Sequence, residues 1–378
     1  MSDLTTIFHH LQRQLFPART DELGALSALD QQFCEVIALT DLGRFTRRYE
    51  WGGNGCPPCP RIWLAHAFIA KHVYQFPATG ALLDALKSRP LLRQLCGWES
   101  AGEIPSEPTF SRAFAAFAQA QLPQQIHDHM VKTYAGTKLV GHVSRDATDI
   151  EAPERPAAKS APAAPAVPRK RGRPKRGEVR LPAPPKRLEL QPTRAAAENL
   201  ADLPVRCDVG CKRNSKGHQE SWIGYKLHLD TVDGDFPVSA ILTSASVHDS
   251  QVAIPLMTMT TERVDYLYDL MDSAYDAEHI HGQSRQLNHV PIIAIHSRRG
   301  TKKPSQLPKV FPVTPTPELT WAEQERYKTR TMSERVNARL KDEFGASHLR
   351  VRGAAKAMAH LMFGVLALTV DQWLRMQT

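Results

Sequence analysis

The sequence lacks a hydrophobic run long enough to cross a membrane. Its longest apolar run, Leu361 to Val370, has ten residues, about half of the ~20 that a membrane-spanning helix needs. The first residues, MSDLTTIFHH, have neither the basic region nor the apolar stretch of a secretory signal peptide. We therefore expect a soluble, cytoplasmic protein.

Cysteine is also scarce. The 378 residues include six cysteines, too few for a fold held together by disulfide bonds. Two pairs, Cys56-Pro-Pro-Cys59 and Cys207-x3-Cys211, could in principle join as a zinc site. The second pair has an unusual spacing and no other metal-ligating residues around it, so we interpret these cysteines as reduced thiols.

The positive charge of the chain is concentrated in one segment. Hydrophobic residues make up 42% and charged residues 23%, which indicates a globular chain with room for two domains. Residues 159–187 hold ten Lys or Arg and one acid, so the remainder of the 48 basic and 39 acidic residues is balanced at 38 of each. The segment also has seven prolines, and we predict a basic, proline-rich disordered insertion at about 155–204.

Within this insertion, Arg171-Gly172-Arg173-Pro174 matches the core of an AT-hook. In that motif an extended backbone places two arginines, here Arg171 and Arg173, in the narrow minor groove of A·T-rich DNA. The alternative is a polybasic linker that contacts phosphates without sequence preference. Both interpretations predict a nucleic-acid partner.

The chain divides into a helical part and a part rich in strands. Up to residue 137, apolar residues recur at helical spacing, as in RIWLAHAFIAKHVYQF and FSRAFAAFAQAQL, so we expect a small helical domain, with a helix-turn-helix as one option. From residue 138 the order of expected elements is β-β-β-α-β-α-β-α, and Asp233-Gly234 marks a hairpin between the second and third strands. This order predicts an α/β domain over 138–378, with a mixed five-stranded sheet and flanking helices.

Three acids follow this pattern closely. We expect Asp146 to end the first strand, Asp272 to end the fourth, and Glu334 to lie on the helix after the fifth. Strand ends and neighbouring helices gather at one edge of an open α/β sheet, so the three carboxylates are predicted to converge. Oxygen ligands suit Mg²⁺ or Mn²⁺, and a pair of such ions can clamp both reacting oxygens of a phosphoryl transfer.

The stretch YKTRTMSERVNARLKDEFG, residues 327 to 345, predicts one amphipathic helix. At about 100° per residue, Tyr327, Arg330, Glu334 and Lys341 fall within roughly 60° of one another, opposite an apolar stripe. A solvated surface helix is the simplest interpretation of such a pattern. If this face lies next to the two aspartates, however, Glu334 would bind a metal, and Tyr327, Arg330 and Lys341 would bind DNA.

On these residues the chain resembles bacterial insertion-sequence DDE transposases of the group marked by the Y-(2)-R-(3)-E-(6)-K signature. The signature is complete at Tyr327, Arg330, Glu334 and Lys341, and DSAYD after residue 271 is similar to the segment of the second aspartate. The resemblance implies a ribonuclease-H-like fold, Mg²⁺-dependent cleavage at terminal inverted repeats of double-stranded DNA, and transfer of the freed 3′-hydroxyl into a target. It also implies a homodimer on DNA and a nucleoid-associated location.

Shorter segments extend the resemblance. RDATDIEA is similar to the segment of the first aspartate, assigned to Asp146 with Asp149 as the fallback. In SVHDS, His248 and Asp249 are candidates for shaping the site, although a helix cap by Asp249 is the favoured interpretation. PSEPTFSRAF, residues 105 to 114, is similar to a segment of the helical domain in related transposases, which would make that domain the reader of the inverted repeats.

Two further features lie near the expected site. The loop after residue 296 carries Arg298 and Arg299, which we regard as candidate phosphate ligands or as part of a solvated loop. Trp321 could stack on a displaced base, but we expect a packing role.

Two other functions stay open from sequence. A transposase-derived protein could bind DNA without cutting it, and a ribonuclease-H-like nuclease could cut without strand transfer. The complete signature argues against the first, and the separate helical domain argues against the second.

Overall fold

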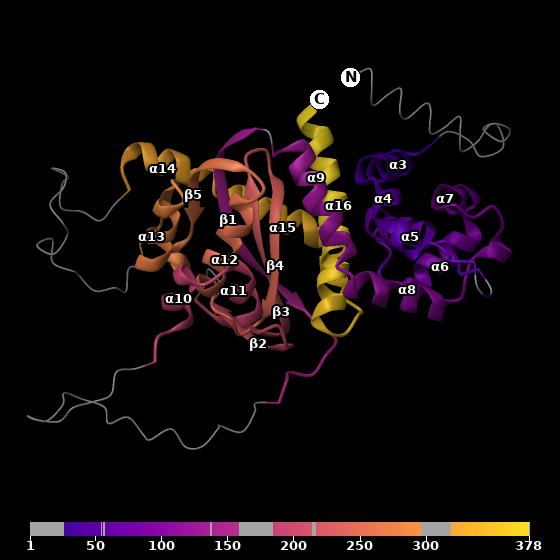
Figure 1. Cartoon of the computed structure of the whole chain (residues 1–378), viewed down its shortest axis with the longest axis horizontal. Helices are drawn as coiled ribbons and strands as arrows, with labels where there is room; N and C mark the ends of the chain where they lie inside the picture. The colour runs from indigo at the N-terminus through magenta and orange to yellow at the C-terminus, as the bar shows by residue number, and fades with distance from the viewer. Residues whose placement is uncertain are drawn as a thin grey trace, which may run out of the picture.

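The structure is a computed structural model that describes residues 26–53, 55, 57–136, 138–158, 184–213, 217–295 and 319–377. A helical N-terminal part lies beside a sheet with helices on both faces (Figure 1). The helices of the N-terminal part are α3 (Ala28–Thr40), α4 (Leu42–Thr46), α5 (Arg61–Val73), α6 (Thr79–Ser88), α7 (Pro90–Cys96), α8 (Glu107–Gln119) and α9 (Leu122–Tyr134).

The helical spacing of apolar residues predicts α5 and α8 correctly. Ser106 is the N-cap residue of α8, and Phe110, Phe114 and Phe117 lie on its buried face. These rings surround Phe68 of α5, with ring centroids 4.9 to 6.2 Å apart. Such tilted and edge-to-face aromatic contacts fill a core efficiently.

The sheet has six strands, and the sequence predicted five of them. They are β1 (Leu139–Glu151), β2 (Asp208–Arg213), β3 (Gln219–Val232), β4 (Phe236–Ser244), β5 (Asp265–Met271) and β6 (Val290–Ile293). β3 pairs antiparallel with β1, β2 and β4, whereas β1, β5 and β6 are parallel. The additional strand is β2, whose sequence DVGCKR lacks the apolar alternation that reveals a half-buried strand.

One glycine allows three strands to meet. Gly224 of β3 lies opposite both Glu151 of β1 and Asp208 of β2. Its φ is +153°, and a Cβ atom there would lie 2.0 Å from the carbonyl oxygen of Ile150. Only glycine fits so close a backbone approach.

Helices cover both faces of the sheet. Alternate residues of β4 point to opposite faces: Ala240 and Leu242 join the core that contains helix α15 (Thr331–Asp342), and Ile241 packs with helix α12 (Ser250–Thr261). Helix α13 (Glu278–Gln286) follows β5 after a short 3₁₀ turn, η4 (Ser273–Tyr275).

The predicted disordered insertion over 155–204 is too long. Residues 184–204 are described and include α10 (Arg187–Leu190), η3 (Gln191–Thr193) and α11 (Ala196–Asp202). Leu200 and Leu203 pack against α12 residues, and Arg187 forms an ion pair with Asp202. Three apolar anchors at 188, 200 and 203 are enough to fold this end of the segment onto the sheet domain.

The single helix predicted over 327–345 is also wrong in detail. The chain forms α14 (Trp321–Lys328), turns at residues 329 and 330, and continues as α15. The expected apolar stripe is correct from the turn onward, because Met332, Val336, Leu340 and Phe344 are all buried. Tyr327 therefore lies on a different helix from Glu334 and Lys341, which the periodicity could not reveal because the turn keeps helical backbone angles.

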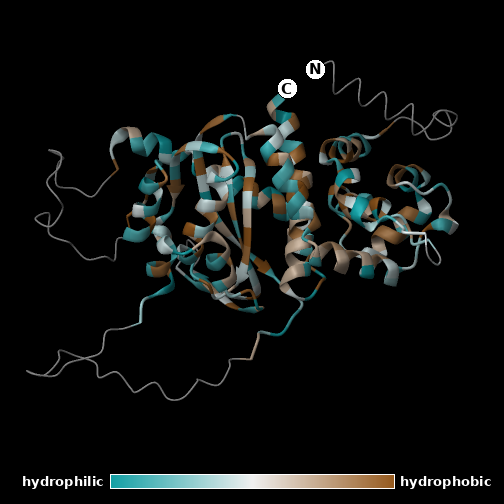
Figure 2. Cartoon of the chain, viewed as in Figure 1, coloured by the Kyte–Doolittle hydropathy of each residue, from teal (hydrophilic) through white to brown (hydrophobic). Residues whose placement is uncertain are grey.

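The long helix α16 (Ala354–Gln377) lies between the two parts of the protein (Figure 1). It packs against α3, α5, α8 and α9 of the N-terminal part and against β4 of the sheet. In Figure 2 it is mostly white to brown where it passes between them, with teal residues toward its C-terminal end. By length and mean hydropathy (1.3) the helix could span a membrane, but 72% of its apolar window is buried inside the protein, as in a core helix.

Candidate active site

The register of the parallel strands β1 and β5 brings Asp146 and Asp272 together. Arg145 lies opposite Met271, so the next residues in the two strands are Asp146 and Asp272. The prediction that Asp146 ends its strand is wrong, because β1 continues to Glu151 along β3. Its pairing with β5 nevertheless ends at Arg145, so both aspartates lie at the same edge of the parallel part of the sheet.

Burial and nearby carboxylates raise the pKa values of Asp146 and Asp272. The pKa of Asp146 rises to about 6, first because the carboxyl is buried and then because the charges of Asp272 and Asp249 are near. The pKa of Asp272 is also raised, by burial and by Asp249. Asn337 of α15 donates a hydrogen bond to Asp146 Oδ2 (3.1 Å), and the backbone amide of Ala274 donates to Asp272 Oδ1 (2.9 Å).

Asp249 belongs to the surroundings of this pair, and the helix-cap interpretation is wrong. Its carboxylate makes no capping hydrogen bond to α12 and instead pairs with Lys226 of β3 at 2.9 Å. His248 bonds Ser250 (2.8 Å) and lowers the pKa of Asp272 through its charge. Both residues are therefore near the aspartates.

A pocket of about 390 Å³ opens beside Asp272. Its walls come from residues next to this aspartate and from the segments before α12 and α13; they are Leu188, His248, Ser250, Asp272, Ser273, Ala274, Asp276 and Ala277. Leu188 comes from the folded end of the segment predicted to be disordered. This pocket leaves space at the aspartate edge for a group on a substrate.

Arg330 connects Glu334 with the two aspartates. Its guanidinium forms an ion pair with Glu334 at 2.5 Å and lies 5.6 Å from the ring centre of Tyr327. Its positive charge lowers the pKa values of both Asp146 and Asp272. Two other signature residues, Tyr327 and Glu334, thus lie against the guanidinium of Arg330.

The fourth signature residue, Lys341, contacts a different carboxylate. Its Nζ lies 3.2 Å from Asp149 Oδ1, which also pairs with Lys212 at 2.8 Å. Burial raises the pKa of Asp149, but these two lysines outweigh it and hold the pKa below its usual value. Asp149, the fallback for the first aspartate, is therefore already neutralised by protein cations, whereas Asp146 is not.

The start of α15 is fixed to β1 by a serine. Ser144 Oγ lies 2.8 Å from the carbonyl oxygen of Arg330, to which it donates, and 2.8 Å from Ser333 Oγ. Ser144 and Ser333 are fully buried. Because Ser144 is two residues before Asp146 on the same strand, these bonds hold Arg330 and Glu334 in place relative to the aspartates.

The donor set fits a hard divalent cation. Two adjacent, partly buried carboxylates keep raised pKa values despite Arg330, and oxygen ligands are those preferred by Mg²⁺ and Mn²⁺. Within the described ranges, no three His, Cys, Asp or Glu side chains are close enough to hold a metal ion together. Asp146 and Asp272 could hold one, and Glu334 is the nearby carboxylate, now paired with Arg330.

A buried ionic network that was not predicted from the sequence lies directly next to the site. Arg145 of β1 pairs with Asp230 of β3 (2.6 Å) and Asp269 of β5 (3.4 Å), and all three are at most 1% exposed. Thr260 donates to Asp230, and Ser284 donates to Asp269. The available signal was a charged residue at a core position in each of three strands.

The other predicted residues have mixed outcomes. Arg171, Arg173, Arg298 and Arg299 lie outside the described residues. Trp321 does not pack as expected, since it is 76% exposed at the start of α14. For zinc, Cys59, Cys207 and Cys211 are free thiols, and Cys56 lies outside the described residues.

Two protein-family models match the chain. The model of the transposase DDE domain matches residues 142–370, more than half of the chain, and the model of a transposase domain (DUF772) matches residues 21–116. The first range contains both aspartates and the whole signature. No curated protein and no solved structure matches the chain.

Proposed function

Since the chain belongs to the DDE-domain transposases, a family of metal-dependent DNA phosphoryl-transfer enzymes with a ribonuclease-H-like fold, we propose that it cleaves DNA at terminal inverted repeats. The freed 3′-hydroxyl then attacks target DNA. The main support is the β1–β5 register, which makes Asp146 and Asp272 neighbours at the open edge of the sheet. We assign the chain to the Y-(2)-R-(3)-E-(6)-K group of insertion-sequence transposases and expect it in the cytoplasm, associated with the nucleoid.

We propose Asp146, Asp272 and Glu334 as the catalytic residues. They would hold Mg²⁺ or Mn²⁺ as two ions, which would activate the attacking oxygen and stabilise the leaving oxygen of a phosphodiester. Asn337 and the amide of Ala274 keep the two aspartates oriented. Preorganised carboxylates lose little conformational freedom when the cation binds.

The signature cations and the tyrosine would bind the DNA strand that is cut. Arg330 lies beside the aspartates, so its guanidinium is positioned for a phosphate next to the scissile bond. Lys341 and the ring of Tyr327 would contact the flanking backbone. Arg171, Arg173, Arg298 and Arg299 extend this proposal as further DNA ligands.

The helical N-terminal part would read the inverted repeats. It includes most of the range matched by the transposase domain model, and the segment PSEPTFSRAF forms the start of α8 in it. Double-stranded DNA is thus the partner of both parts. We propose a homodimer on DNA, because two transposon ends have to be brought together.

The decisive experiment is strand cleavage of DNA that carries the inverted repeats flanking this reading frame. Wild type and Glu334→Gln are compared in Mg²⁺ and Mn²⁺, with binding of the same DNA measured in parallel. Glu325→Gln is the matched control, because Glu325 also forms an exposed ion pair on the preceding helix, with Lys328.

We expect wild type and the control to nick the repeat ends and Glu334→Gln to bind without cutting. A wild type that binds but never cuts would replace the proposal with a non-catalytic DNA-binding protein. Cleavage without joining to a target would favour a ribonuclease-H-like nuclease.

A further inference from the structure

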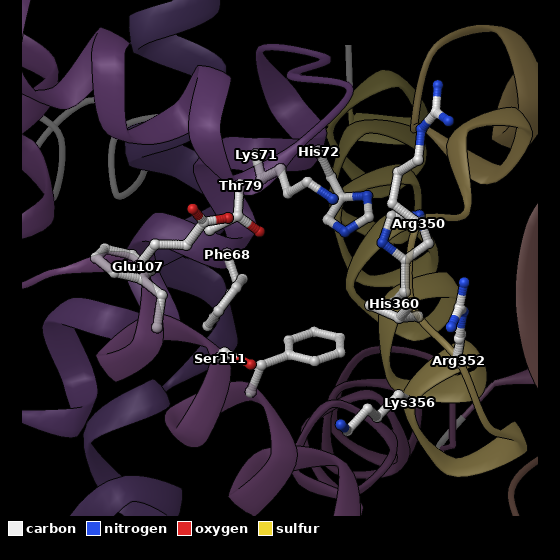
Figure 3. Close-up of a pocket in the computed structure, with 13 residues that line it drawn as sticks. Phe68, Lys71, His72, Thr79, Glu107, Ser111, Arg350, Arg352, Lys356 and His360 are labelled. Atoms are coloured by element: carbon white, nitrogen blue, oxygen red, sulfur yellow. The ribbon is translucent and has the colours of Figure 1, made fainter. Parts of the chain in front are cut away.

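A second pocket, of about 340 Å³, is lined by residues that are far in sequence from Asp146 and Asp272. It lies between the N-terminal helices and the segment that leads into α16 (Figure 3). α5, α6 and α8 form one wall, and residues 350–360 form the other. Its lining residues are Phe68, Lys71, His72, Thr79, Glu107, Phe110, Ser111, Phe114, Arg350, Val351, Arg352, Lys356 and His360.

The charges around this pocket do not balance. Lys71, Arg350, Arg352 and Lys356 face a single acid, Glu107. Within the described part of the chain, none of these four cations has an ion pair with a carboxylate; Arg352 Nε donates to the carbonyl oxygen of Pro153 at 3.2 Å. Because the chain outside residues 159–187 has equal numbers of acids and bases, this excess is local.

Lys71 is the most informative of the four. It is only 6% exposed, its side chain lines the pocket, and no hydrogen bond joins its ammonium to a described residue. Burial, and then the charge of Arg350, lower its pKa to about 8. A buried ammonium next to a second cation is costly unless an anion lies against it.

The two histidines of the pocket have structural roles and do not add charge. His72 Nδ1 bonds the carbonyl oxygen of Phe344 (2.9 Å), and His360 Nε2 bonds that of Gly345 (3.1 Å). Burial lowers the pKa of His72 to about 3, so the ring is neutral. Through these bonds, the pocket wall is attached to the turn that follows α15, the helix of the signature.

We propose that this pocket binds a phosphate of the DNA backbone, as a DNA contact separate from the aspartate edge. Arg350 and Arg352 are exposed and Lys71 is buried, so positive charge leads from the surface inward. Thr79 and Ser111 add hydroxyl donors on the opposite wall, and such donors commonly bind phosphate oxygens. The inference rests on the proposed function, because it takes the phosphate from the same DNA.

The test is DNA binding in EDTA, which needs no catalysis. A fluorescent duplex carrying the flanking inverted repeat is titrated at several NaCl concentrations against wild type and Arg350→Gln/Lys356→Gln. The matched control is Arg206→Gln/Lys87→Gln, which removes the same charges from exposed positions outside the pocket. Lys356→Arg keeps the positive charge and tests whether charge at this position is sufficient for DNA binding.

We expect the pocket variant to bind about tenfold more weakly, with a salt slope reduced by about 1 to 2, because each phosphate contact releases roughly one counterion. The control and Lys356→Arg should bind like wild type. Equal affinity of pocket variant and control would overturn the inference while leaving the proposed function intact. If wild type itself does not bind the duplex, both fail.

A measurement with inorganic phosphate distinguishes a site for a DNA phosphate from a site for free phosphate. Its effect on the melting temperature is measured for the same proteins. If the pocket variant loses stabilisation by inorganic phosphate but binds the duplex like the control, the site takes free phosphate, and a DNA contact is excluded.

Discussion

Arg145 and Asp146 are neighbours in β1 but belong to two different arrangements of charge. On one side of the strand, Arg145 pairs with Asp230 and Asp269, and the hydroxyl groups of Thr260 and Ser284 each donate a further hydrogen bond to one of these carboxylates. On the other, Asp146 lies next to Asp272 with a raised pKa, and the only described cation acting on both is Arg330. Three strands thus carry one compensated set of buried charges and one that needs a cation from outside.

This contrast separates structural acids from functional ones. A buried carboxylate that only supports the fold is paired, since an unpaired one is costly. A pair of carboxylates that repel each other is kept only where something else, such as a metal ion, binds them. Substitutions in the two sets of charges test this distinction.

Asp272→Asn should reduce cleavage in Mg²⁺ by at least about 1000-fold, because a metal ligand contributes several kcal/mol to the transition state. DNA binding should be unchanged. The measurement is the rate of strand nicking, and Asp265→Asn, at the exposed start of the same strand, is the control. A loss of less than tenfold would remove Asp272 from the functional set.

Arg145→Met should destabilise the protein by about 3–5 kcal/mol, because it leaves two buried carboxylates without their cation. Urea denaturation measures the change in the free energy of unfolding. Arg335→Met is the control: it breaks the more exposed pair with Asp235, which should cost about 1 kcal/mol or less. Similar losses for the two variants would mean that the network does not support the fold.

Asp146→Asn should stabilise the metal-free protein at pH 7.5 by about 1–3 kcal/mol, because the folded pKa of about 6 exceeds the ordinary value of 3.8. The ionised carboxyl costs stability above its folded pKa, and this cost disappears as the pH falls toward the unfolded value. The advantage of the variant should therefore shrink between pH 7 and pH 4. Thermal melts in EDTA across this range measure it.

Added Mg²⁺ should favour wild type over Asp146→Asn, the opposite of the stability difference expected in EDTA. It should raise the melting temperature of wild type more than that of Asp146→Asn, since binding to the folded state stabilises it. A variant that is less stable than wild type in EDTA at pH 7.5 would contradict the assignment of Asp146 to the uncompensated set.

Ser144→Ala should cost about 1 kcal/mol of stability, because it removes one buried hydrogen-bond donor between β1 and the start of α15. Cleavage should also slow, since Glu334 is held less firmly relative to the aspartates. Denaturation and nicking rates measure the two effects. Ser88→Ala, an exposed serine that bonds within its own helix, should change neither by a measurable amount.

The sequence predicts individual helices and strands better than the contacts between them. Periodicity predicted five strands, α8 and the buried stripe of α15, because each depends on local alternation of apolar residues. The convergence of Asp146 and Asp272 at one edge was predicted from strand ends, but their direct adjacency depends on strand register, which is a property of the whole sheet. The break at Thr329 and the fold of α10 and α11 were missed because tertiary contacts decide them.

The polar residues show the same limit. Arg145, Asp230 and Asp269 each look like an error in an apolar strand until all three are seen together. Asp249 matched a helix cap by its position, yet Lys226 lies close enough to bind it instead. Pairing between distant residues cannot be recognised from the spacing of one segment.

The position of α16 has a consequence for how the protein is made. The N-terminal helices and β4 both bury apolar side chains against Ala354–Gln377, so neither half has a complete core while the ribosome is still translating the residues before it. A nonsense or frameshift mutation between Glu334 and Ala354 would leave both aspartates and Glu334 encoded in a chain with an open core. Such a product would be a substrate for proteases and chaperones rather than a shortened enzyme.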